Sequence, residues 1–348
     1  MQLTISVSCS NCLKAMNIYI TRCHFNAAIP NAEKRMQDLH LNRQAHLFLL
    51  YETSRRQHAL VDDADHADVI FVMSVNASTE SLIRRYPEKC FALDENDDPQ
   101  GVLRGIYACN RRSIPLFWTG RFRTGCYQLY PSVFANPAVQ SHLGDAWLHP
   151  KKYLATFVGR MSHRCREEIM TLEFSRSDIL TQNSSEFDLF SDSGEKRSFQ
   201  ERFAKMMVES KFVLCPRGAG ASSIRLFEAM QMGVAPIIIS DDWIAPKGPD
   251  WSAFSIRLPE GSTELESMLV ENELHYEEMG RQARAAWERF FSDETHFDYL
   301  VAQATDIMRT QWIPEKFLWN LRSAIAFRDR IMRGLKRRLC KITLSLTI

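Results

Sequence analysis

Residues 211–250, KFVLCPRGAGASSIRLFEAMQMGVAPIIISDDWIAPKGPD, are the stretch of sequence that decides the fold. A short apolar run, Phe212–Cys215, stops at a proline, and Gly218 and Gly220 then allow positive φ and a close approach of the backbone to an anion. A second apolar run, Val234–Ile239, carries no charge, as expected for a parallel strand covered on both faces. The stretch therefore predicts one βαβ unit.

The helix of this unit would offer an anion site at its N-terminus. Ser222 and Ser223 can cap it, and the free N–H groups and positive dipole end of a helix attract phosphate. Arg217 and Arg225 add fixed cations that suit a diphosphate. Glu228 lies one to two turns into the helix, where its carboxylate can accept hydrogen bonds from two sugar hydroxyls. We expect these residues to hold a nucleotide.

These residues also carry a resemblance to a known family. Residues 212–243 resemble the signature of the exostosin-like glycosyltransferases, residues 152–160 resemble the opening strand of that family's second domain, and residues 67–72 resemble a strand of its first. The resemblance spans roughly residues 16–305. It implies two facing Rossmann-like domains (GT-B type) with a cleft between them. It also implies that a nucleotide-sugar binds in the C-terminal domain as a substrate, with no separate cofactor.

Length and patterning agree with two α/β domains. The chain has 348 residues, of which 45% are hydrophobic and 24% charged, as in ordinary globular proteins. We expect an N-terminal extension at 1–15, an acceptor-side domain at 16–149, a nucleotide-sugar domain at 150–305, and a closing helix with a basic amphipathic tail at 306–348. Whether translation starts at Met1 or Met16 stays open.

Hydrophobic periodicity predicts alternating strands and helices in both halves. The first half has expected strands at 16–21, 67–73 and 90–93, a helix at 32–39, a strand-like apolar run at 45–51, and loops over 101–150. The second half has an expected strand at 154–158, a helix at 164–174, a surface loop at 181–199, a helix at 199–210, a strand at 254–258, and helices near 262–270 and 274–291.

Charge and cysteine content exclude several classes of protein. The net charge is +1, which argues against a nucleic-acid binder, although a basic excess lies after Lys316. Nine scattered cysteines do not form a disulfide framework, so we expect reduced thiols in a cytosolic compartment. No window is long and apolar enough for a membrane span. We therefore expect a cytoplasmic, bacterial-type enzyme without the Golgi anchor of the animal and plant relatives.

The basic tail has helical periodicity. Beyond Pro314 the arginines lie mostly between apolar residues spaced along one helix face: Leu318, Leu321, Ile325, Met332, Leu335 and Leu339. Up to residue 327 this segment either closes the fold by packing on the first domain or lies on an anionic membrane. For Arg328–Lys341 the sequence favours attraction to an anionic membrane surface, which would make the enzyme peripheral on the inner face.

Further candidates lie where predicted strands end. Arg160 follows a predicted strand and could bind the diphosphate, while Asp241 and Asp242 follow another and could contact the donor sugar or cap a turn. The resemblance implies an inverting reaction, which needs a general base, and the sequence leaves His24 and Asp94 as candidates. An Asp-x-Asp pattern at a strand end is not found in this context, so no metal site is expected.

We therefore expect an inverting, metal-independent glycosyltransferase that moves a sugar from a nucleotide-diphosphate donor, UDP-linked by the resemblance, to a cell-surface glycan in polysaccharide biosynthesis. The alternative is a non-catalytic nucleotide-sugar-binding subunit that supports a partner transferase. A dinucleotide oxidoreductase is excluded, because no Gly-x-Gly-x-x-Gly follows an N-terminal strand.

Overall fold

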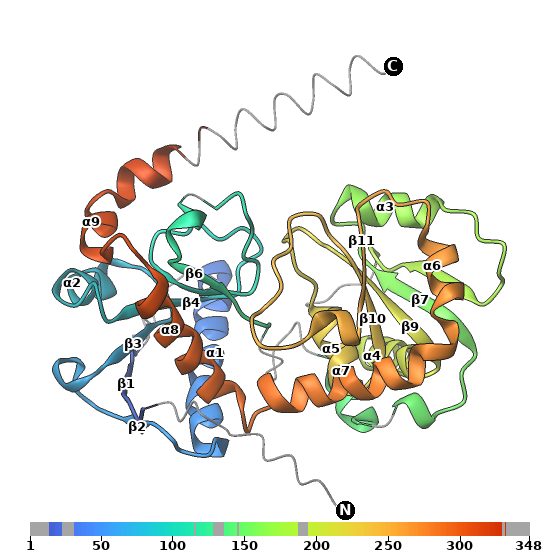
Figure 1. The fold of residues 1–348 in the computed structure, drawn as a ribbon, viewed down its shortest axis with the longest axis horizontal. Coiled ribbons are helices and arrows are strands. Elements are labelled where there is room, and N and C mark those ends of the chain that lie inside the picture. Colours follow the sequence, from blue (N-terminus) through green and yellow to red (C-terminus); the bar gives the residue numbers. More distant parts are fainter. Residues whose placement is uncertain are drawn as a thin grey trace, which may run out of the picture.

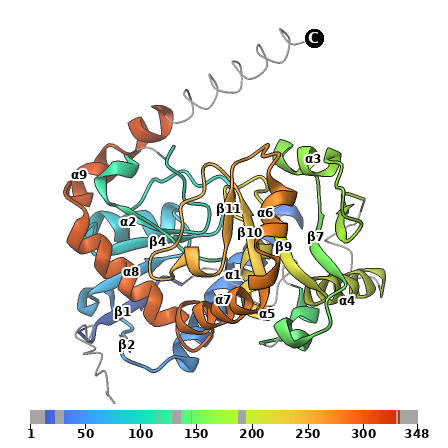
Figure 2. The ribbon, with the colours of Figure 1, turned by 45° about the vertical axis from the view of Figure 1, so that its right-hand side comes forward.

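Two parallel β-sheets, each flanked by helices, form two α/β domains (Figures 1 and 2). The structure is a computed structural model that describes residues 14–22, 31–114, 116–127, 136–144, 146–186, 194–328 and 331. The fold class predicted from the alternation of strands and helices is confirmed. No helix in these described ranges is long and apolar enough to cross a membrane.

The first domain is built on a six-stranded sheet of order β2-β1-β3-β4-β5-β6. Its strands are β1 Asn17–Ile20, β2 Ala59–Leu60, β3 Val69–Val72, β4 Cys90–Asp94, β5 Gly105–Tyr107 and β6 Phe122–Thr124. Its helices are α1 Asn31–Thr53, α2 Ala77–Arg85 and the 3-10 turns η1 Ala64–His66 and η2 Phe117–Thr119. Every residue of β3 is buried, so both faces of the strand are covered, which explains its uninterrupted apolar sequence.

The second domain is built on a five-stranded parallel sheet of order β11-β10-β9-β7-β8. Its strands are β7 Tyr153–Gly159, β8 Ile179–Asn183, β9 Ser210–Pro216, β10 Ala235–Ile239 and β11 Ile256–Leu258. Its helices are α3 Arg164–Thr171, α4 Gly194–Val208, α5 Ile224–Met232, α6 Leu265–Glu271 and α7 Tyr276–Phe290, with 3-10 turns η3 Pro137–His142, η4 Ala146–Leu148, η5 Trp251–Ala253 and η6 Glu273–His275. The βαβ unit predicted from residues 211–250 is β9, α5 and β10.

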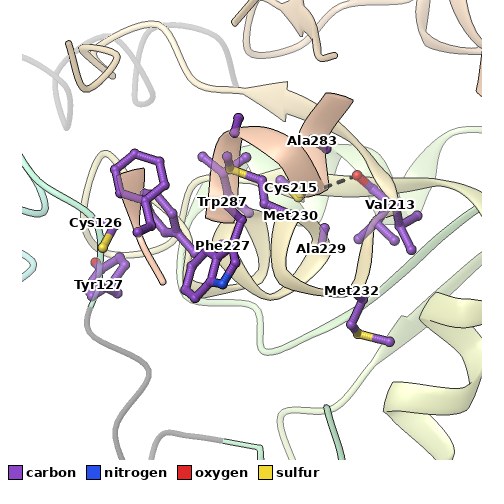
Figure 3. Packing of buried hydrophobic residues seen from close by; sticks show 14 of the residues in the cluster. Cys126, Tyr127, Val213, Cys215, Phe227, Ala229, Met230, Met232, Ala283 and Trp287 are labelled. Carbon is purple, nitrogen blue, oxygen red and sulfur yellow. Dashed lines mark hydrogen bonds between the residues drawn. The ribbon is translucent and has the colours of Figure 1, made fainter. Parts of the chain in front are cut away.

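Helix α5 is the centre of the second domain's core. It ends at Gly233, whose φ of 80° is the left-handed conformation expected of a C-terminal glycine. Phe227 and Met230 pack with Trp287 of α7 against the sheet (Figure 3). Tyr127, which enters from the first domain, lies edge-on to Phe227 with ring centroids 6.3 Å apart. The core therefore extends across the boundary between the domains.

After α7 the chain returns to the first domain. Helix α8, His296–Thr310, packs Phe297 and Leu300 into the core of the first sheet, and Figure 1 shows it lying across that domain. Helix α9, Glu315–Asn320, follows and buries Trp319 on the opposite side of the sheet. Glu315 forms a fully buried ion pair with Arg121. The segment up to residue 328 thus packs on the first domain, whereas residues 332–348 lie outside the described ranges.

One predicted strand-like run, residues 45–51, is wrong. These residues form the C-terminal half of α1, which is much longer than the helix predicted at 32–39. Leu47 and Leu50 are buried while Leu49 is exposed, which is the three-residue spacing of a helix face. The apolar residues at 45–51 follow one another so closely that a buried helix segment could not be distinguished from a strand by its pattern.

Two predicted loops also contain strands. Residues 101–150 include β5 and β6, which are three residues long each and were hidden by neighbouring glycines and arginines. Residues 181–199 include the end of β8 and the start of α4. β8 is an edge strand with half-exposed polar side chains, so its sequence lacks the apolar signal of a buried strand.

Candidate functional site

A cavity of about 290 Å³ lies between the two domains, where β7 and β9 end and α5 begins. The second domain contributes Arg160, Ser222, Arg225 and Glu228 to its wall, and the first domain contributes Asp97. The carboxyl ends of parallel strands are the usual ligand side of an open α/β sheet. Most of the residues predicted from the glycine turn and its helix are therefore brought together in one place.

The N-terminus of α5 opens into this cavity. Ser223 is the N-cap residue with extended backbone, and its side chain makes no capping hydrogen bond in the described structure. Ser222 is buried, and its Oγ has no hydrogen-bond partner among the described residues. The first N–H groups of a helix have no partner within the helix. This end of α5 can therefore accept an anion, to which Ser222 would donate a hydrogen bond.

Arg225 is held rigidly in the wall of the cavity. Its guanidinium donates to the carbonyl of Val158 and lies over the rings of Phe157 and Phe203, at 4.9 and 5.3 Å from their centroids. Burial lowers its pKa, although Glu228 and Cys215 oppose the shift. Its Nε has no hydrogen-bond partner in the described ranges. A half-buried cation with unused donor capacity is well suited to bind a phosphate.

Glu228 lies one turn further along α5 and is buried. Burial raises the pKa of its carboxyl group to about 7, and the nearby charge of Arg225 opposes this shift. Among the described residues no hydrogen bond to this carboxylate is found. A carboxylate left without protein donors inside a cavity can accept hydrogen bonds from ligand hydroxyls.

Gly218 and Gly220 adopt ordinary backbone conformations, so the expected positive φ is wrong at both. The reason for glycine is space. A Cβ on Gly220 would lie 2.8 Å from Oδ1 of Asp97 and against the sulfur of Cys109. A Cβ on Gly218 would lie 3.0 Å from the guanidinium of Arg166. The glycine turn is therefore the place where the first domain and the half-buried Arg166 approach the backbone closely.

Arg166 connects the turn after β7 with the turn after β9 by hydrogen bonds to both. It donates to the backbone oxygens of Arg160, Arg217 and Pro216 at 3.0, 2.9 and 3.3 Å. Burial lowers its pKa to about 10. From the sequence this residue is an ordinary helix-start arginine, and its role could only come from the tertiary contacts.

The first domain faces the cavity through Asp97 and Tyr127. The Tyr127 hydroxyl donates to Oδ1 of Asp97 at 2.9 Å and lies 2.7 Å from the sulfur of Cys109. Burial raises the pKa of Tyr127 well above its usual value, so the phenol stays a donor. The sequence signal for Asp97 was its place in the acidic loop that follows β4.

Asp94, the predicted base on the same loop, does not line the cavity. Its Oδ1 accepts from the backbone N–H of Asn96 at 2.7 Å, and it faces Arg43. Burial raises its pKa. His24, the other predicted base, lies outside the described residues.

Arg217 and the two aspartates after β10 form a separate cluster. Arg217 pairs with Asp242 at 3.4 Å and with Glu260 at 3.5 Å. The backbone N–H of Asp241 donates to the Glu260 carboxylate at 3.1 Å, and the backbone N–H of Glu260 donates to Oδ1 of Asp241 at 3.2 Å. None of these residues lines the cavity that Arg225 and Glu228 share. The structure thus separates Arg217, Asp241 and Asp242 from the other predicted residues.

No group of three histidine, cysteine, aspartate or glutamate side chains that could hold a metal ion occurs in the part of the chain that the structure describes. The five cysteines in that part, Cys90, Cys109, Cys126, Cys165 and Cys215, are free and buried.

The fold and the cavity define an α/β protein of two domains, with the uncapped N-terminus of α5 at the cavity between them. In a comparison with known proteins, the family model of the exostosin GT47 domain matches residues 117–272, somewhat less than half of the chain. Exostosin-2 of Mus musculus is 28% identical over 188 residues, which cover 50% of this chain and 26% of that protein. Exostosin-2 of Homo sapiens is 26% identical over 189 residues, with the same coverage. Over this part of its length the chain is similar to the exostosin-like glycosyltransferases, in agreement with the resemblance of its sequence signature.

The match therefore spans only about a quarter of the length of these two relatives. Solved structures with detectable similarity include MurG of Acinetobacter baumannii, with a TM-score of 0.33 and 11% identity over 80% of this chain and 82% of that one. Another is TarM, with a TM-score of 0.32 and 8% identity over 76% of this chain and 46% of that one.

Proposed function

We propose that this protein transfers a sugar from a nucleotide-diphosphate donor, UDP-linked as the family resemblance implies, to a hydroxyl of a glycan with inversion at the anomeric carbon. The observation that carries the proposal is the shared cavity of Ser222, Arg225 and Glu228 at the N-terminus of α5. The similarity of residues 117–272 to the exostosin GT47 domain supports the same chemistry.

In this proposal each group of the cavity has one task. Glu228 accepts hydrogen bonds from the two ribose hydroxyls of the donor. Arg225, Arg160 and the N–H groups of α5 receive the diphosphate, whose negative charge grows as the bond to the anomeric carbon breaks. These cations would take the part that a metal ion plays in metal-dependent enzymes, so the proposed reaction needs none.

The proposed general base is Asp97 in place of Asp94. The acceptor oxygen attacks the anomeric carbon, its proton passes to the Asp97 carboxylate, and the nucleotide diphosphate leaves from the opposite side. Tyr127 would orient the carboxylate through the hydrogen bond to Oδ1. Asp97 is suited to this role because it comes from the first domain and lines the same cavity as Arg225.

Donor binding is tested by thermal unfolding with a panel of nucleotide-sugars. A ligand present at 100 times its Kd stabilises the folded protein by about 2.7 kcal/mol, so we expect a clear rise in Tm with UDP-sugars. No rise with any nucleotide-sugar would contradict the proposal. A rise without release of nucleotide diphosphate in any acceptor mixture would instead favour a non-catalytic binding subunit.

The role of Asp97 is tested by Asp97→Asn, with Asp98→Asn as its control. Asp98 is next in the same loop but pairs with Arg111 instead of facing the cavity. We expect Asp97→Asn to lower turnover by about 10²-fold or more while donor binding is kept. Equal loss in both variants would show that only the shape of the loop matters.

A further inference from the structure

Two tryptophan side chains lie against each other on the surface of the first domain. Trp118 in η2 and Trp312 in the turn between α8 and α9 are 62% and 61% exposed, and their ring centroids are 5.0 Å apart. Exposed apolar groups that gather in one place mark interaction sites more often than scattered ones do. Nothing in the proposed glycosyl transfer uses this pair.

The backbone beneath the two indoles is fixed. The Trp312 N–H donates to the Thr119 carbonyl, and a Cβ on Gly120 would lie 2.7 Å from the Thr310 carbonyl oxygen. Glu315, just after Trp312, is locked by its buried ion pair with Arg121. The backbone that presents the two rings is therefore held in place by these contacts. Figures 1 and 2 show α9, which begins three residues after Trp312, on the outside of the first domain.

An exposed apolar stripe continues from this pair along α9 and the helical residues 322–328. Phe317 is 64% exposed, and Leu321, Phe327 and Ile331 are exposed as well. The opposite side of α9 is buried through Leu318 and Trp319. The helix thus packs on the domain with one face and offers a second apolar face to the outside. We call Trp118, Trp312 and this stripe the tryptophan platform.

Basic residues outnumber acidic ones around the platform, although Arg322 forms an ion pair with Glu80 of α2. Between Met308 and Arg328 the only acidic residue is Glu315, which is buried. The same stretch contains Arg309, Lys316, Arg322 and Arg328. The sequence that follows adds one acidic residue, Asp329, and six cations: Arg330, Arg333, Lys336, Arg337, Arg338 and Lys341. The surface is thus complementary to an anionic partner that also has an apolar interior.

We propose that the tryptophan platform docks the protein on an anionic lipid bilayer. Indole rings favour the level of the lipid headgroups, because they have both an apolar face and a polar N–H. The flanking cations are attracted to anionic headgroups, and the apolar stripe can lie at the boundary of the acyl chains. The surface would hold the enzyme beside a membrane-bound acceptor, but docking does not depend on the proposed transfer.

The experiment is sedimentation of the full chain with vesicles of phosphatidylcholine and phosphatidylglycerol, and with vesicles of phosphatidylcholine alone. We expect salt-sensitive binding to the anionic vesicles. The double variant Trp118→Ala/Trp312→Ala should bind about tenfold more weakly, because binding scales with the apolar area that is buried. The control is Leu274→Ala, which removes a 92% exposed apolar side chain from η6 of the second domain and should bind like wild type.

A second measurement covers the case in which the double alanine variant fails to fold. Brominated lipids should quench the tryptophan fluorescence of the wild type, and Trp118→Phe/Trp312→Phe, which keeps the ring packing, should lose most of that quenching. Unchanged vesicle binding by a folded double variant would overturn the proposal. So would dimerisation without lipid that both substitutions abolish, because a second copy of the chain would then be the occupant.

Discussion

Asp97 of the first domain and Gly220 of the second lie so close that a side chain on the glycine would collide with the aspartate. The Cβ of an alanine at position 220 would stand 2.8 Å from Oδ1 and 3.0 Å from Cα of Asp97. The acidic loop after β4 therefore packs directly against the glycine turn before α5. This contact brings the proposed base to the cavity that contains Arg225 and Glu228.

Gly220→Ala should disturb the contact between the acidic loop and the glycine turn. The new methyl group must push the Asp97 backbone away, and overpacking of this kind costs about 1–3 kcal/mol. We expect a lower free energy of unfolding and a marked loss of transfer activity. Gly194→Ala is the matched control, since a Cβ at that helical position meets no atom within 4 Å. Equal activity in the two variants would show that the close approach has no functional role.

Glu228 should make stability depend on pH. Because its folded pKa is raised from 4.5 to about 7, the neutral carboxyl is favoured in the folded protein. Its contribution is fully present below pH 4.5 and is lost as the pH rises through 7, a change of roughly 3 kcal/mol at one pKa unit per 1.36 kcal/mol. Urea unfolding from pH 5 to 8 should show this loss in wild type but not in Glu228→Gln.

The variant isolates the effect of Glu228 from that of buried histidines, which act in the opposite direction. Burial lowers the pKa of His296 from 6.5 to about 4, so its contribution to stability is present above pH 6.5 and is lost as the pH falls towards 4. Only the difference between wild type and Glu228→Gln is therefore diagnostic. A flat difference from pH 5 to 8 would contradict the raised pKa of Glu228.

The two arginines beside the glycine turn should differ in function. Arg225 lines the cavity, whereas the guanidinium of Arg217 forms ion pairs with Asp242 and Glu260 outside it. Arg225→Ala should lower kcat by about 10²-fold, since its charge matters most as the diphosphate departs. Arg217→Ala should change kcat less than tenfold. Steady-state kinetics with thermal unfolding of both variants is the check, and the reverse order would assign the diphosphate to Arg217.

The contrast between these arginines shows where sequence reasoning succeeds. The strand, turn, helix and strand of residues 211–250 were predictable because buried parallel strands and a glycine C-cap leave local signals. The direction in which a side chain points leaves no such signal in the local sequence. Arg217 and Arg225 have the same chemistry and lie eight residues apart, yet packing against Phe157 turns only one of them into the cavity.

The first domain was harder to predict for a related reason. The acidic loop after β4 could be recognised as a ligand side, but choosing Asp97 over Asp94 required the hydroxyl of Tyr127, which is distant in sequence. Edge strands such as β8 are also hard to recognise, because their exposed polar side chains resemble those of a loop.

Residues after Phe327 should contribute to membrane binding without contributing to the donor site. Seven lysines and arginines lie between Arg328 and Lys341, and each adds on the order of 1 kcal/mol near an anionic surface. Truncation after Phe327 should therefore weaken sedimentation with anionic vesicles, most strongly at low salt, while the thermal shift with a nucleotide-sugar stays the same. The tryptophan platform loses only Ile331, so part of the apolar contribution should persist. If the truncated chain unfolds instead, these residues belong to the packed fold of the first domain and their basic charge has a different role.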